Sequence, residues 1–126
     1  NISSEAKENY LLDNGINYRN GIELFGDIET YNEMLSDWYH DCEQKWSKVK
    51  ELYQNSDMKN YSVEVHSLKS DSKYFGFTKL AELALNHELR SKENDLKYVK
   101  SNFKTLEKEY QRIVKIVAVY LKNKES

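Results

Sequence analysis

The chain has 126 residues, of which 32% are charged and none is proline, and its formal net charge is −2. This length suits one domain with a core of its own and is too short for a catalytic domain together with a regulatory one. The weak negative charge gives no electrostatic reason to expect nucleic-acid binding, and no apolar run approaches the ~18 residues of a membrane span.

Residues 1–26 show the weakest hydrophobic periodicity and contain three of the four glycines. We interpret this stretch as an N-terminal tail with one or two short helical turns, for which residues 18–25 are the strongest candidate. We treat it as separate from the domain that follows, which we place at residues 27–126.

A long amphipathic helix is predicted over residues 28–53, with Asp27 as its N-cap. Its apolar residues recur at intervals of three and four, which predicts one core-facing stripe: Tyr31, Leu35, Tyr39, Cys42, Trp46, Val49 and Tyr53. An aromatic stripe at helical spacing is far more often packing than a ligand pocket. His40 lies beside acidic residues, and we assign it to the surface without a role.

A second helix is predicted over residues 58–74, after a break at residues 55–57. Its apolar stripe is expected to face the core and consists of Tyr61, Val65, Leu68, Ser72 and Phe75. Gly76 is a plausible helix stop, because glycine tolerates the left-handed backbone that ends helices.

Two further helices are predicted at residues 77–90 and 95–122. The first has a stripe formed by Leu80, Leu83, Ala84 and His87, and the second is nearly heptad-like over its whole length. Four amphipathic helices with short connections predict an all-α protein, an antiparallel four-helix bundle with a short N-terminal helical extension.

His66 lies well away from the apolar stripe of the second predicted helix, so it should face solvent. The residues on its side of the helix are small or basic: Ser62, Lys69, Ser70 and Lys73. A neutral imidazole is a nucleophile, and nearby lysines can offset the charge of a phosphoryl group. No acidic residue of the same helix shares this side, so we expect no carboxylate beside His66, and no metal-ligating residue stands at i±4. We therefore expect phosphorylation chemistry and no metal site.

The string around this histidine, His-x-Leu-Lys-x-x-Ser-x-x-x-Gly from His66 to Gly76, resembles the signature of histidine-containing phosphotransfer (HPt) domains. A following helix with Leu80, Leu83-Ala84 and Glu88 continues the pattern. Residues 16–26 also resemble the lead-in of such domains. The string departs from the family at Ser70, where glycine is usual, and at Asp71, where a small residue is common.

The resemblance implies a phosphorelay carrier. The histidine, here His66, accepts a phosphoryl group from the aspartyl phosphate of a receiver domain and passes it to another receiver. Lys69 would stabilise that group and Lys73 would be a weaker second contact, while Ser62, Ser70 and Gly76 would leave room for the receiver to dock. The Mg²⁺ of such transfers is held by the receiver in the family, so we expect no bound cofactor. The protein would be a stoichiometric intermediate rather than an enzyme.

Two alternatives stay open at this point. The string Asn86-His87-Glu88-Leu89-Arg90-Ser91 resembles the phosphoacceptor box of histidine kinases, although the usual Thr-Pro is missing. Because His87 falls on an apolar stripe, we expect it to be packed in a helix seam. The other alternative is a passive helical interaction module whose lysines are simply a solvated face.

We expect a cytoplasmic protein without direct membrane contact. Its only cysteine, Cys42, excludes an internal disulfide framework, and its first residues lack the layout of a secretory signal. Because the chain begins with Asn1 rather than Met, it also fits a module of a bacterial hybrid sensor kinase, including the cytoplasmic portion of a membrane-bound kinase. We otherwise expect a monomer, since a bundle complete in one chain needs no partner to close its core.

Overall fold

The computed structural model describes residues 4–125, and the predicted all-α fold is confirmed. Within that range the helices are α1 (Ser4–Asp13), α2 (Tyr18–Phe25), α3 (Ile28–Gln54), α4 (Met58–Phe75), α5 (Thr78–Lys92) and α6 (Leu96–Glu125). No strand occurs among these residues, which hold only an isolated bridge between Ile16 and Phe77. Residues 1–3, the beginning of the predicted tail, and residue 126 lie outside the described residues.

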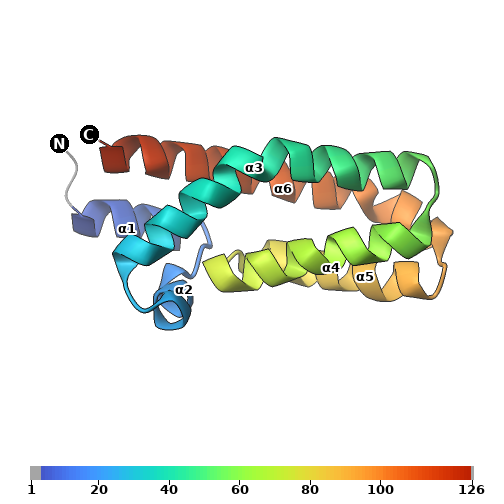
Figure 1. Ribbon diagram of the computed structural model, residues 1–126, viewed down its shortest axis with the longest axis horizontal. Coiled ribbons are helices and arrows are strands. Elements are labelled where there is room, and N and C mark those ends of the chain that lie inside the picture. The colour runs from blue at the N-terminus through green and yellow to red at the C-terminus, as the bar shows by residue number, and fades with distance from the viewer. Residues whose placement is uncertain (1–3, 126) are drawn as a thin grey trace.

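Helices α3 to α6 form an antiparallel four-helix bundle in which consecutive helices are neighbours and α6 closes the ring against α3 (Figure 1). The observed ends of these helices differ from the predicted ends by three residues or fewer. Short turns connect the helices, so each one runs opposite to the previous one. The most extensive packing joins α4 to α5.

The core follows the predicted stripes closely on α4 and less closely on α3. All five residues of the predicted α4 stripe are buried. On α3 the buried face is rotated toward Trp38 and Leu52, while Tyr39, Trp46 and Tyr53 are half-buried. Polar atoms on the aromatic rings explain part of this rotation, since the Trp46 indole N–H donates to Glu107 at 3.0 Å on the rim of the core.

The N-terminal segment is more ordered than the sequence suggested, because α1 is a ten-residue helix where a tail was expected. It packs against α6, where the Arg112 guanidinium donates to the carbonyl of Asn14 at 2.9 Å. Leu11 and Ile16 are fully buried in the same core as the bundle. Tertiary contacts therefore hold a helix whose own sequence has no clear apolar face. The boundary at residue 26 stays a prediction.

Gly76 connects this segment to the bundle. It ends α4 in the left-handed conformation, with φ of +86°, and its carbonyl accepts a hydrogen bond from the Asn17 N–H at 2.8 Å. A Cβ at this position would collide with the backbone of Asn17. This close contact fixes α2 beside the end of α4 and the start of α5.

No helix in residues 4–125 combines the length and apolarity that crossing a lipid bilayer requires.

Candidate functional site

His66 lies in the middle of α4, on the side turned away from the core. Asp57 caps the helix by accepting a hydrogen bond from the Asn60 N–H, and the buried stripe fixes the rotation of the helix about its axis. The His66 side chain is 55% exposed, as helical geometry predicted.

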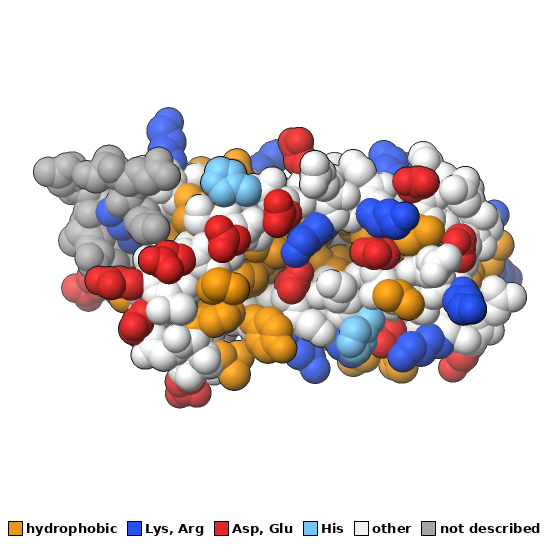
Figure 2. All heavy atoms as spheres, viewed as in Figure 1, with side chains coloured by type: hydrophobic (Ala, Val, Ile, Leu, Met, Phe, Trp, Pro, Cys, Tyr) orange, Lys and Arg blue, Asp and Glu red, His pale blue; other side chains and the backbone are white. Residues whose placement is uncertain are grey.

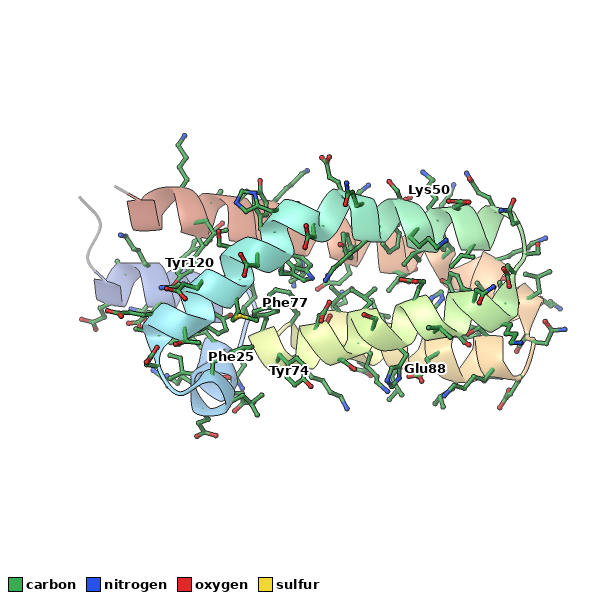
Figure 3. All side chains as sticks on the ribbon, in the orientation of Figure 1. Phe25, Lys50, Tyr74, Phe77, Glu88 and Tyr120 are labelled. Atoms are coloured by element: carbon green, nitrogen blue, oxygen red, sulfur yellow. The ribbon has the colours of Figure 1, made fainter. Side chains whose placement is uncertain are left out.

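A carboxylate lies directly beside this histidine, contrary to the expectation that none would. Glu88 projects from α5 toward α4 (Figure 3), and its Oε2 lies 2.7 Å from Nδ1 of His66. The Glu88 side chain is only 3% exposed. Helical spacing within α4 could not reveal this contact, because Glu88 reaches the site through the antiparallel packing of α5 on α4. The sequence did contain a signal for the position of Glu88. It stands four residues after Ala84, and residues at this spacing share a face of the helix, here the inward face of α5.

Two lysines complete the surroundings of the Glu88 carboxylate. Lys69 Nζ lies 2.7 Å from Oε1, and Lys92 Nζ lies 2.9 Å from Oε2. Burial acts to raise the pKa of Glu88, but hydrogen bonds from its three nitrogen partners outweigh burial and lower the pKa to about 2. Glu88 is therefore ionised at neutral pH.

The ionised carboxylate decides which nitrogen of His66 carries the proton. A carboxylate only accepts hydrogen bonds, so Nδ1 must be the donor. In the neutral ring, Nε2 then holds the lone pair. Nε2 has no hydrogen-bond partner among the side chains that the structure describes, so this half-exposed ring presents a free nucleophilic nitrogen.

The predicted lysines occupy different environments. Lys69 is mostly buried, with 14% of its side chain exposed, and is paired with Glu88 rather than open to solvent. Lys73 is exposed and forms no ion pair with any other described residue. Lys92, by contrast, had no role predicted from the sequence.

The predicted small docking residues are less open than expected. Ser62 is buried, and its hydroxyl donates to the carbonyl of Lys59 at 2.7 Å. Ser70 is half-buried, and Gly76 is buried against Asn17. The expectation of exposed small groups at Ser62 and Gly76 is therefore wrong, because the neighbouring elements cover both positions.

A groove of about 560 Å³ lies where α2 meets the end of α4 and the start of α5. Its lining combines apolar, small and charged residues: Asn20, Glu23, Leu24, Ser72, Lys73, Gly76, Thr78, Ala81, Glu82 and Leu85. Figure 2 shows apolar side chains gathered at this end of the molecule, where α2 approaches α4. Lys73 lies two helical turns from His66, so the groove begins near the histidine.

His87 is packed in the helix seam, as predicted. It is 1% exposed, its Nδ1 lies 2.9 Å from the Tyr61 hydroxyl, and its Nε2 lies 3.2 Å from the carbonyl of Asn102. Burial lowers its pKa to about 4, so it is neutral at physiological pH. With both nitrogens engaged inside the bundle, His87 is inaccessible to a macromolecular partner.

The described part of the chain holds no group of three or more His, Cys, Asp or Glu side chains arranged to bind a metal ion.

In a comparison with known families, the family model described as Hpt domain matches residues 33–115. The matched stretch contains His66, Glu88 and both lysines of the cluster. No curated protein and no solved structure matches the chain.

The buried histidine predicts an acid-sensitive fold. His87 binds a proton near pH 4 when folded and near pH 6.5 when unfolded, so the free energy of unfolding should fall as the pH decreases between these values. We expect a loss of about 2 kcal/mol between pH 7 and pH 4.5, measured by chemical denaturation. Glu88 adds to this only below about pH 4.5, since its folded pKa is about 2.

The variant that tests this is His87→Gln. Its free energy of unfolding should be lower than that of the wild type at pH 7 but should fall less on acidification. An unchanged pH dependence in this variant would show that other groups cause the acid sensitivity.

Proposed function

The chain belongs to the Hpt domain family, and from this premise we propose that His66 carries a phosphoryl group between receiver domains. Members of this family transfer phosphoryl groups through a histidine and interact with receiver domains of two-component systems. The observation that supports His66 as the carrier is its hydrogen bond to buried Glu88, which leaves Nε2 as the free nucleophile.

In the proposed step, the lone pair of Nε2 attacks the phosphorus of an aspartyl phosphate on the receiver. The N–P bond forms as the P–O bond to the aspartyl carboxylate breaks, and the carboxylate leaves with the electron pair. The proton on Nδ1 stays in place, so positive charge develops on the ring during attack. The second transfer reverses these changes with the aspartate of another receiver.

Glu88 would act as the positioning residue for this step. Its carboxylate holds the Nδ1–H tautomer and lies 2.7 Å from the nitrogen where positive charge develops. Burial keeps water from competing for the carboxylate, and its low pKa keeps it ionised throughout the physiological range.

Lys69 would balance the negative charge of the buried Glu88 carboxylate, in addition to the phosphate-stabilising role that the family suggests. Lys73, exposed and free of an ion pair among the described residues, would be a weaker contact at the mouth of the groove. The domain would end each half-reaction covalently changed, which makes it a stoichiometric carrier with no cofactor of its own. The Mg²⁺ would come with the receiver, and both partners would meet in the cytoplasm.

The groove between α2, α4 and α5 would be the docking surface for the receiver. Its near end lies two helical turns from His66, and its apolar lining includes Leu24, 60% exposed on one wall, and the half-buried Leu85 on the other. Ser70 lies on α4 between His66 and the groove residue Lys73. A transient partner needs only a modest apolar contact of this kind.

Labelling by receiver domains identifies the acceptor histidine. Wild-type protein incubated with phosphorylated receiver domains should gain one acid-labile phosphoryl group, detected by intact mass. His66→Gln should gain none, because the nucleophile is gone, whereas His87→Gln should still be labelled. Label that follows His87, or no label from any receiver, would contradict the proposal, and the second result would favour a passive helical module.

Glu88→Gln should slow labelling of His66 at least about tenfold, because an uncharged amide neither fixes the tautomer nor stabilises the charged ring. The measurement is the rate of transfer from a receiver, with helix content checked by circular dichroism. A folded Glu88→Gln protein that accepts phosphate at the wild-type rate would remove Glu88 from the mechanism.

Leu24→Ser tests the docking surface. It should reduce transfer from a receiver about five- to tenfold, because it removes an apolar contact at the partner interface. Labelling by phosphoramidate, a small donor that needs no docking, should be unchanged. Val119→Ser, at an exposed apolar position on α6 (44% against 60% for Leu24), is the control and should transfer normally. Equal effects of the two substitutions would place docking elsewhere.

A further inference from the structure

We propose that Lys92, the last residue of α5, is a phosphate-binding residue that moves from Glu88 to the phosphoryl group when His66 is modified. This inference rests on the proposed function of His66 and adds a residue that neither the sequence motif nor the family match assigns.

The position of Lys92 follows from a shared atom. Its Nζ lies 2.9 Å from Glu88 Oε2, the same oxygen that accepts the hydrogen bond from His66 Nδ1 at 2.7 Å. Lys92 and the imidazole are therefore neighbours across one carboxylate oxygen. A lysine side chain has four flexible carbons, so rotation about its side-chain bonds can carry the ammonium group from the Nδ1 edge of the ring toward the Nε2 edge.

The charges of the cluster leave one cation in excess. Lys69 and Lys92 together provide two positive charges against the single negative charge of Glu88. With His66 neutral, the cluster thus has a net positive charge before phosphorylation. A phosphoryl group brings close to two negative charges, which the second lysine partly balances. With Lys69 alone the unmodified cluster would be neutral, and no positive charge would remain to attract the group.

The exposures of the two lysines indicate which one moves. Lys69 is 14% exposed and is committed to the buried carboxylate, whereas Lys92 is 58% exposed and shares the solvent side of the site with His66. If Lys69 left Glu88, a largely buried ion pair would break, which is costly. If Lys92 left, Glu88 would still keep Lys69 and the Nδ1–H of His66.

Arg90, the other cation in the last turn of α5, is already engaged. Its guanidinium lies 3.3 Å from Asp95 Oδ2 and 5.0 Å from the centre of the Tyr98 ring. Lys92 is therefore the cation of this turn that is placed for the phosphoryl group.

The test measures the phosphoryl group itself. Wild-type protein, Lys92→Gln, Lys92→Arg and the control Lys79→Gln are labelled with phosphoramidate, in which attack by Nε2 breaks the P–N bond of the donor and ammonia leaves. The pKa of the phosphoryl group is then read from the pH dependence of its ³¹P NMR signal. A nearby cation stabilises the dianion, so we expect Lys92→Gln to raise this pKa by about 0.5.

Lys92→Arg should restore the wild-type titration, because arginine keeps the charge, and Lys79→Gln should match the wild type. A role of Lys92 in folding alone would leave the titration unchanged and would appear in thermal unfolding instead. Normal titration in Lys92→Gln would overturn this inference while His66 remained the acceptor. Failure of wild-type protein to be labelled at His66 by phosphoramidate and by every receiver would overturn the proposed function as well.

Discussion

The structure around His66 depends on one buried negative charge. A carboxylate that is 3% exposed is tolerated only when cations or donors surround it, and removing one partner of such a pair typically costs about 3–5 kcal/mol. The partners of Glu88 come from two helices, so the charge fixes the register of α5 against α4. The same contacts set the tautomer of the histidine. The same set of hydrogen bonds thus fixes the packing of α5 on α4 and the tautomer of His66.

Much of the bundle could be predicted from the sequence, because its helices have strong signals of their own. The stripe of α4, the cap at Asp57 and the glycine stop at Gly76 are local patterns, and each of them appears in the structure. The α3 stripe was less well predicted, because rings with polar atoms rest at the edge of the core. The helix α1 was missed because contacts with α6, rather than its own periodicity, hold it in place.

In the candidate site, too, features set by one helix could be predicted, whereas contacts between helices could not. The position of His66 and the burial of His87 follow from helical rotation alone, and both were predicted correctly. Glu88 and Lys92 were missed because they come from another helix, 22 residues or more along the chain from His66. The openness of Ser62 and Gly76 was misjudged for a related reason, since spacing along one helix does not reveal which neighbouring elements cover a residue.

The close contact between Gly76 and Asn17 joins two parts of the molecule that contribute different residues to the groove. The residues around Glu88 lie within the stretch that matches the family, whereas α2, one wall of the groove, lies before it. Exchanging the N-terminal segment between relatives would alter the shape of that wall without touching the imidazole or its buried partner. The proposed docking wall and the proposed phosphoacceptor can therefore be changed independently of each other.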